Sequence, residues 1–535
     1  MAPAHTVADL IALACALHGV RRAFGVPGGG SSLDLIEAFG RVGIDFVLCR
    51  TETGAALAAA ADAELRNGFG VAIATQGPGA ASAMNGLAHA SLDRAPVLFI
   101  SDGWNARQRA IDTHQVFDQC AMSAPVVKAH ARLEADDPSA ELDGLLSSML
   151  TAPWGPAHLE LTGEAARRAI TVPPRQPNRA QAAPQVHGDA AQLLRSTRRP
   201  VVLVGLECRG DDAADAVNEL VRRLRCPVLT TYKAKGVTDG AGDFTVGCFT
   251  GGAAEAECIG AADLIVLCGL DPVELIGRPW PYTAPVLDIS LVRHPVHYVE
   301  PAAAIRGPLA ASLSGLLPHG AASAWAAEEI AQLRARMRSR LASPASTAGL
   351  SPQVVVETAQ RVAGPRAARI TVDAGAHMFS AMAFWRAGRP GGALISNGLA
   401  TMAYALPAGI ASALHEPEQP TLVFTGDGGL MMCAGELATA AQHNANLCVI
   451  VFNDAALSLI ALKQRNRGMV DAGVRWAHAD FVSVARGFGL RAFSAHDEAG
   501  YEKALEEALS APGPTLIDVR VDPSGYRTQA QALRG

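Results

Sequence analysis

Short runs of apolar, often β-branched residues alternate with longer Ala- and Leu-rich stretches along the whole chain. Runs such as 421–425 and 447–452 are mainly hydrophobic over their length, which is typical of parallel strands that are buried on both faces. Parallel strands need crossover connections, and the Ala- and Leu-rich stretches suit crossover helices. The alternation therefore predicts an α/β fold of doubly wound parallel sheets.

At 535 residues the chain is too long for one hydrophobic core. A prior of about 150 residues per domain suggests three or four domains, and three fit best. Two seams divide the sequence: the proline-rich stretch 173–184, and the stretch 318–351, where an Ala/Arg-rich helix is expected before Ser343-Pro-Ala-Ser346. We therefore expect domains over residues 1–175, 185–340 and 345–535.

Charge and composition exclude several partner classes. The net charge of −6 and the lack of a Lys/Arg cluster with interleaved aromatics predict no nucleic-acid binding. No apolar run approaches the roughly 20 residues of a membrane span. The hydrophobic content of 49% favours a partly covered surface, as in an oligomer.

The N-terminus and the cysteines both favour a cytoplasmic location. The apolar stretch 8–17 lacks a basic segment before it, and Thr6 with Asp9 predicts a capping box at the start of a helix. The ten cysteines have no C-x-x-C spacing, so we expect them to be small buried hydrophobes in a reducing compartment.

The segment 421–454 predicts strand, glycine loop, helix and strand in that order. Asp427 and Asp454 would then lie just beyond the carboxyl ends of adjacent parallel strands, where α/β sheets place their ligands. Two carboxylates there, with free amides in the turn Gly426–Gly429, can hold a hard divalent cation and a diphosphate. Taken alone, each of these groups could equally be an ordinary turn or loop residue.

The joint pattern is more specific. A G-D-G triplet followed 27 residues after its Asp (454 − 427) by an Asn-Asn or Asn-Asp pair is typical of thiamine-diphosphate enzymes, and Asn453-Asp454 completes it here. The chain resembles the acetolactate synthase and pyruvate oxidase family over nearly its whole length. Besides the G-D-G segment, the matching blocks occur in family order at 24–29, 50–56, 76–79, 230–236, 373–377 and 398–408.

This resemblance implies a pyrimidine-binding, a middle and a diphosphate-binding domain, with thiamine diphosphate and Mg²⁺ as cofactors. It implies that Mg²⁺ is bound by the Asp427 carboxylate, the Asp454 side chain and the Ala456 carbonyl. The family usually carries Asn where Asp454 stands, but an aspartate still offers a hard oxygen. The diphosphate would be contacted by Gly375, Ala376, His377, Gly426, Gly428 and Gly429.

Glu52 follows the strand-like run 45–49 and precedes an Ala-rich helix. An isolated glutamate there would simply suit the helix macrodipole. In the block R-x-E-x-G-A-A, however, the resemblance implies the acid that hydrogen-bonds the aminopyrimidine ring and promotes loss of the thiazolium C2 proton. Met402 matches the apolar residue beneath the cofactor, and the Ala400 carbonyl and Met402 amide would hold the pyrimidine edge.

Glu52 belongs to the first predicted domain and Asp427 to the third, so one cofactor must contact both domains. In the family these two domains come from different subunits. The resemblance therefore implies a homodimer or homotetramer with active sites at the subunit interface.

Some positions depart from the family pattern. In 113–118 Gln115 is retained, but His114 replaces a Phe; His114 could transfer protons or be an ordinary loop residue. Leu275 replaces the arginine that serves the second substrate, and Lys463 replaces a tryptophan. Both changes argue against the standard acetohydroxyacid synthase reaction, and the altered block around Leu275 predicts that FAD is absent.

Several functions are compatible with these residues. The leading hypothesis is decarboxylation of a 2-oxo acid or related carbonyl substrate, with release of an aldehyde or carboligation to an acceptor. A C–C bond hydrolase or lyase of the same family and a non-catalytic cofactor-binding paralogue remain alternatives, although Glu52 disfavours the paralogue. A nicotinamide dehydrogenase is poorly supported, because 25–30 lacks a clean G-x-G-x-x-G.

Overall fold

The computed structural model describes residues 5–171, 173–175, 183–275, 279–344, 346 and 348–534. Most of the proline-rich seam, 176–182, and residues 1–4, 345 and 535 at the predicted domain limits lie outside the described residues. The described chain contains three large sheets with helices between their strands, so the α/β fold is confirmed. Each sheet lies within one of the three predicted ranges, while the exact domain limits stay a prediction.

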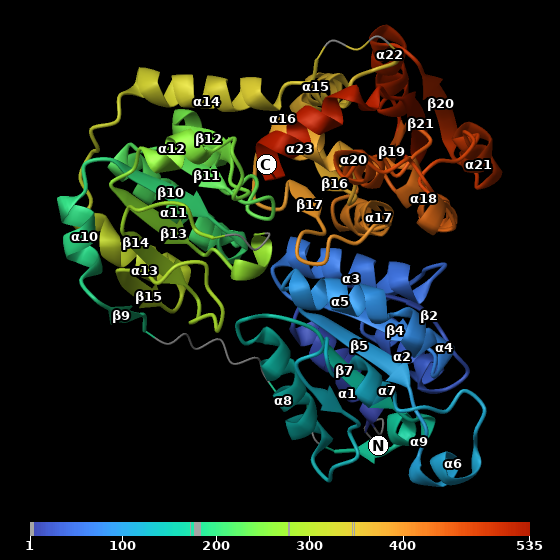
Figure 1. Ribbon diagram of the computed structural model, residues 1–535. Coiled ribbons are helices and arrows are strands. Elements are labelled where there is room, and N and C mark those ends of the chain that lie inside the picture. Colours follow the sequence, from blue (N-terminus) through green and yellow to red (C-terminus); the bar gives the residue numbers. More distant parts are fainter. Residues whose placement is uncertain are drawn as a thin grey trace. The chain divides into compact units, whose positions relative to one another are not determined.

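The first sheet has six parallel strands (Figure 1). Their order is β3 (Asp45–Leu48), β2 (Arg22–Val26), β4 (Gly70–Ala74), β5 (Val97–Asp102), β7 (Ala157–Leu161) and β6 (His130–Ala131). Apolar side chains of α1 (Val7–Leu17), α2 (Ser31–Arg41) and α8 (Pro138–Leu150) share one core with this sheet. The helices α3 (Glu52–Arg66) and α5 (Met84–Leu92) contact each other and the sheet.

The second sheet has seven strands, six of them parallel. Their order is β12 (Thr245–Cys248), β11 (Val228–Thr230), β10 (Pro200–Val204), β13 (Leu264–Cys268), β14 (Val286–Ser290), β15 (Ala303–Arg306) and the antiparallel β9 (Gln185–His187). The predicted Ala/Arg-rich helix is α14 (Ala327–Leu341), which ends two residues before Ser343.

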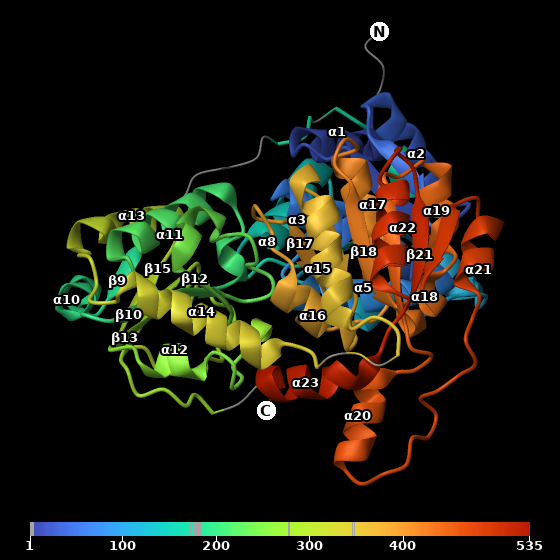
Figure 2. The ribbon, with the colours of Figure 1, turned by 90° about the horizontal axis from the view of Figure 1, so that it is seen from above.

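The third sheet is six-stranded and parallel throughout (Figure 2). Its order is β17 (Ala393–Ile395), β16 (Arg369–Val372), β18 (Thr421–Gly426), β19 (Leu447–Asn453), β21 (Thr515–Arg520) and β20 (Arg491–Ala495). The helices α15 (Pro352–Ala363) and α22 (Glu498–Ala508) contact each other beside this sheet. The predicted order of strand, helix and strand over 421–454 is therefore confirmed.

The chain forms two compact units. The first comprises residues up to 180 together with 399–417 and 433–445, and the second comprises the remaining residues. The first unit therefore includes α17 (Ala405–His415) and α19 (Glu436–Gln442), which come from the third predicted range. Residues 54–63 of α3 are all buried and mostly alanine, so α17 can approach α3 closely.

Two smaller expectations are confirmed. Thr6 Oγ1 accepts the Asp9 amide at 3.2 Å, and Asp9 Oδ2 accepts the Thr6 amide at 2.9 Å, which is the predicted capping box. All ten cysteines are free, and all but the half-buried Cys120 are buried. Among the described residues, none of the helices has both the length and the apolarity that a membrane crossing requires.

Gly70→Ala is expected to destabilise the first unit, because a Cβ at Gly70 would lie 1.9 Å from the Ala59 carbonyl oxygen of α3. Overpacking of this kind costs about 1–3 kcal/mol. The matched control is Gly144→Ala inside α8, where an added Cβ meets nothing within 4 Å. That change should be neutral or stabilising by up to about 1 kcal/mol. Calorimetric unfolding of both variants checks this, and equal transition temperatures would contradict it.

Candidate active site

Asp427 and Asp454 follow adjacent parallel strands. Asp427 comes directly after β18 and Asp454 directly after β19, and the strands are paired up to Gly426 and Phe452. Because this register ends both strands at the same edge of the sheet, the two carboxyl groups lie close enough to interact electrostatically. The structure thus brings together the two residues that were expected to bind the metal.

Burial raises the pKa of the Asp427 carboxyl to about 7, and the negative charge of Asp454 adds to this shift. The amides of Gly428, Ala455 and Ala456 oppose it, so Ala456 also lies beside Asp427. The Asp427 Oδ2 atom is buried without a hydrogen-bond partner in the described structure. A buried and a half-buried carboxyl group close together, with an unpartnered oxygen, fit a divalent cation, which would compensate their charge.

His377 is the first residue of α16 (His377–Phe384), directly after the loop that follows β16. Its ring stacks on Phe452, with centroids 5.2 Å apart. Added Cβ atoms at Gly375 and Gly426 would lie 2.8 and 3.3 Å from His377 Nδ1, so both glycines border the ring. Burial lowers the pKa of His377 to about 4, and its buried Nε2 has no hydrogen-bond partner in the described structure. A neutral imidazole with one uncommitted nitrogen fits contact with a bound group.

The prediction of a glycine loop after β18 is wrong in one respect. The chain enters α18 (Asp427–Cys433) directly at Asp427, so Gly428 and Gly429 belong to the first turn of this helix. The Gly428 amide is also not free, because it donates to Asp427 Oδ1 at 2.8 Å. A Cβ at Gly429 would lie 2.1 Å from Asp373 Oδ2, so this position needs glycine for close packing.

Glu52 is the first residue of α3, as the sequence predicts, and it is half-buried. A Cβ at Gly79 would lie 3.2 Å from Glu52 Oε1, so the glycine turn at 76–79 contacts this carboxylate. The capping residue Thr51 accepts the Gly54 amide at 2.9 Å, which fixes the start of the helix.

Sequence reasoning missed Glu436. This buried side chain belongs to α19, and its Oε1 accepts the amides of Arg50 and Thr51, each at 3.0 Å. A Cβ at Gly54 would lie 2.4 Å from the same oxygen. Glu436 therefore holds the residues that precede Glu52. A charged residue at the apolar start of an Ala-rich helix is a signal in the sequence, but its partners lie more than 380 positions away.

Gln115 and His114 lie in an exposed loop of the first unit. Gln115 has a left-handed backbone (φ 63°), and a Cβ at Gly77 would lie 2.8 Å from the Gln115 Cβ. The glycine turn at 76–79 therefore contacts both Gln115 and Glu52. His114 is next to Gln115 in the chain, and the two interpretations of this histidine stay open.

Ala400 and Met402 also belong to the first unit, in the connection between β17 and α17. Ala400 is exposed and Met402 is half-buried. Ala400 and Ala403 both have left-handed backbones, with φ of 53° and 68°. Such conformations are unfavourable for alanine, and they cluster at functional sites in proteins.

Two acidic side chains of the chain itself, Glu274 and Glu207, lie at the carboxyl ends of β10 and β14. The Leu206 amide donates to Glu274 Oε2 at 2.9 Å, and the Leu291 amide donates to Glu207 Oε2 at 2.8 Å. His294 Nε2 lies 3.1 Å from Glu207 Oε1. Two backbone donors at this edge, the amides of Leu206 and Leu291, are thus already used by carboxylates of the chain itself.

The two substitutions predicted to alter the reaction lie in the second unit. Leu275 is half-buried and packs against the hydrophobic core. Lys463 is exposed on α20 (Ser458–Asn466).

Residues 5–122, 188–316 and 373–519 match the N-terminal TPP binding domain, the central domain and the C-terminal TPP binding domain of thiamine pyrophosphate enzymes. Acetolactate synthase of Bacillus subtilis (strain 168) is 26% identical, over 97% of this chain and 93% of the relative. The large subunit of acetolactate synthase isozyme 1 of Escherichia coli (strain K12) is 29% identical, over 94% and 92%.

A probable 2-ketoarginine decarboxylase of Pseudomonas aeruginosa is 27% identical, over 94% of this chain and 92% of the relative. The three matching segments occur in order, and each overlaps one of the three large sheets. The chain therefore belongs to the thiamine pyrophosphate enzyme family.

Proposed function

We propose that this protein uses thiamine diphosphate and Mg²⁺ to act on a 2-oxo acid or a related carbonyl substrate, by decarboxylation, carboligation or both. The observation that carries the proposal is the edge of the third sheet, where His377, Asp427 and Asp454 follow β16, β18 and β19. Two of these side chains have buried polar atoms without partners in the described structure. Relatives with acetolactate synthase and 2-ketoarginine decarboxylase names support the substrate class.

In this proposal Asp427, Asp454 and the Ala456 carbonyl hold Mg²⁺, and Gly375, Ala376, His377 and Gly426–Gly429 surround the diphosphate. When bound, thiamine diphosphate supplies the electron sink for cleaving or forming the bond next to a carbonyl. Glu52 shares a proton with the pyrimidine ring, and Ala400 and Met402 hold and support that ring. Gln115 faces the substrate, and His114 is a candidate for proton transfer.

We further propose a homodimer or homotetramer. Glu52, Ala400 and Met402 belong to the first compact unit, and Asp427 belongs to the second. A cofactor held by both sets needs two units to meet, and in a symmetric dimer they can come from different copies of the chain. A C–C bond hydrolase or lyase remains the second candidate, because the same cofactor residues serve that chemistry.

The metal site predicts that cofactor binding needs a divalent cation. Calorimetric titration of metal-stripped protein should show binding of thiamine diphosphate with Mg²⁺ and little binding without it. Asp427→Ala should weaken binding by more than about 100-fold, since even outer-shell partners of a metal are worth 10–100-fold. Asp454→Asn is the matched control, because an amide oxygen is still a hard ligand. Equal affinity with and without the cation would sink the proposed site.

Glu52→Gln should leave cofactor binding largely intact and slow exchange of the C2 proton by about 100-fold or more, as loss of general acid–base assistance does. The amide has nearly the same shape, but it cannot share a proton with the ring nitrogen as a carboxyl group does. Proton–deuterium exchange at C2, followed by nuclear magnetic resonance, measures this step directly. An unchanged exchange rate in the variant would falsify the role proposed for Glu52.

We also propose that the middle domain binds no FAD. A flavin dinucleotide brings a diphosphate that needs backbone donors, and Glu207 and Glu274 already occupy amide donors at the ends of β10 and β14. Leu275 stands where the family carries arginine, so a second 2-oxo acid would also lack that cation for its carboxylate. Burying an unpaired carboxylate costs several kcal/mol by order of magnitude.

The purified protein is therefore expected to show no stoichiometric flavin absorption and to make acetolactate from pyruvate poorly. The measurement is a visible spectrum of fresh protein, followed by an acetolactate assay at saturating pyruvate with thiamine diphosphate and Mg²⁺. Incubation with a panel of 2-oxo acids, with and without aldehyde acceptors, should identify better substrates by mass spectrometry. A full flavin spectrum with fast acetolactate formation would return the protein to the standard synthase class.

A further inference from the structure

The glycine turn at 76–79 depends on one side chain outside it. The Gly77 amide is buried and donates to Gln119 Oε1 at 2.7 Å. Gly77 has φ of 66°, a conformation that glycine adopts readily, and it is the N-cap residue just before α4 (Pro78–Ser82). Gln119 is fully buried at the start of α7 (Gln119–Ser123). A single glutamine therefore anchors the turn that contacts both Glu52 and Gln115.

The amide of Gln119 has only one suitable orientation. Its Nε2 donates to the Asp102 carbonyl at 3.0 Å and to Glu160 Oε2 at 3.3 Å. A carbonyl and a carboxylate only accept hydrogen bonds, so the NH₂ group must face them. The Oε1 atom must then face the Gly77 amide, which only donates.

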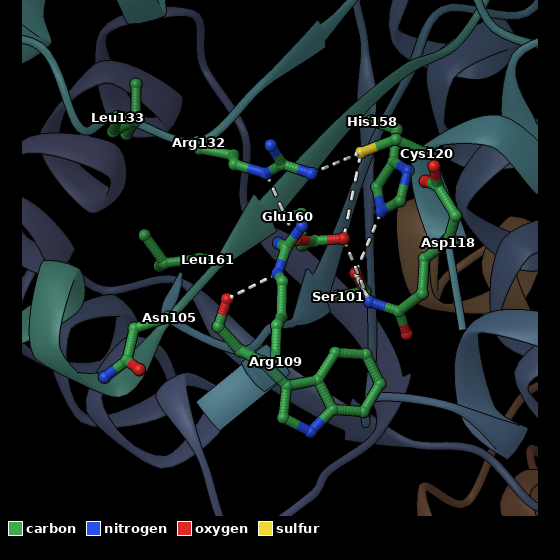
Figure 3. Close-up of polar contacts among 12 residues, drawn as sticks. Ser101, Asn105, Arg109, Asp118, Cys120, Arg132, Leu133, His158, Glu160 and Leu161 are labelled. Atoms are coloured by element: carbon green, nitrogen blue, oxygen red, sulfur yellow. Dashed lines mark hydrogen bonds and ion pairs between the residues drawn. The ribbon is translucent and has the colours of Figure 1, made fainter. Parts of the chain in front are cut away.

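Glu160 is itself held by a cluster of polar side chains (Figure 3). Glu160 is 2% exposed and lies on β7, between β5 and the edge strand β6 of the first sheet. Its Oε1 accepts from Arg109, in a close ion pair, and from Arg132 Nε at 3.2 Å. Cys120 Sγ lies 3.7 Å from Oε2, on the side of Gln119. Two arginines thus fix one carboxylate oxygen, and the other accepts from Gln119 and Cys120.

We propose that Gln119 is a positioning residue, which Glu160 orients so that it holds the glycine turn against Glu52 and Gln115. This inference rests on the proposed function, since it assigns the chain of contacts that places the cofactor-activating carboxylate. All of these residues belong to the first compact unit. The contacts run from two surface arginines through Glu160, Gln119 and Gly77 to Glu52.

Loss of this anchor acts on geometry and leaves the metal and diphosphate residues untouched. Without Oε1 the buried Gly77 amide has no acceptor, and the turn must shift to find one. Gly79 packs against Glu52, so a shift of the turn moves the carboxylate relative to the pyrimidine ring. Proton exchange at C2 should fall, while affinity for thiamine diphosphate and Mg²⁺ should change little.

Gln119→Met keeps the shape of the side chain and removes its polar atoms. We expect C2 exchange at saturating cofactor to slow by about tenfold, as loss of one positioning hydrogen bond does. Ser123→Ala is the matched control on the same helix, because buried Ser123 bonds His158 Nδ1 at 2.8 Å and His130 Nε2 at 3.0 Å without touching the turn. This control should lower the unfolding temperature but leave the exchange rate unchanged.

Glu160→Gln is the second variant. It replaces one carboxylate oxygen by an NH₂ group, at a residue that is linked to Glu52 through Gln119 and the glycine turn. The arginines donate to the amide oxygen at 160, so the new NH₂ group faces the NH₂ group of Gln119. Gln119 must then either tolerate this donor–donor contact or turn its own NH₂ group toward the Gly77 amide. Both outcomes strain the anchor, so we expect slower C2 exchange with unchanged cofactor affinity.

The inference is overturned if Gln119→Met and Glu160→Gln, folded by circular dichroism, exchange C2 as fast as the wild type, or if Ser123→Ala slows exchange equally. Failure of the proposed function gives a different result, because the wild-type protein itself would then show no Mg²⁺-dependent cofactor binding and no accelerated C2 exchange.

Discussion

The register of β18 against β19 is the constraint on which the rest of the candidate site depends. It ends two neighbouring parallel strands at the same level and so places Asp427 and Asp454 together in a largely buried environment. Burying two carboxyl groups side by side is unfavourable unless they are protonated or paired with a cation. Glycines at 375 and 429 avoid collisions with His377 and Asp373, and Gly426 avoids a tight contact with His377, at the same edge of this sheet.

In the first compact unit, neighbouring side chains and backbone fix the half-buried Glu52 at the start of α3. Glu436 binds the amides before Glu52, and the glycine turn at 76–79 packs against its carboxylate. Because Glu436 accepts the amides of Arg50 and Thr51, it fixes the backbone that precedes Glu52. Glu274 and Glu207 likewise accept backbone amides just beyond β10 and β14 of the second sheet.

Much of this architecture could be predicted because it depends on patterns of residues that lie close together in the sequence. Apolar runs predicted the strands of the third sheet, and the local pattern of strand, helix and strand over 421–454 placed Asp427 and Asp454 after adjacent strands. The start of the helix at Glu52 and the capping box at Thr6 were also predictable from neighbouring residues. What could not be predicted depends on contacts distant in sequence, such as Glu436 with Arg50 and Gln119 with Gly77. The direct entry into α18 was missed because glycines are more typical of loops than of a first helical turn.

The left-handed alanines at 400 and 403 bear on how a loop can be strained without weakening the protein. Glycine at either position would relieve about 1–2 kcal/mol of steric conflict. The unfolded chain would, however, gain freedom worth about 0.4–1 kcal/mol per residue, and much of the relief would be lost on folding. The net free energy of unfolding is therefore lowered only a little by alanine at these positions. Alanine also allows the loop around Met402 fewer conformations than glycine would. Rigidity here comes from restricting the alternatives as much as from contacts in the folded state.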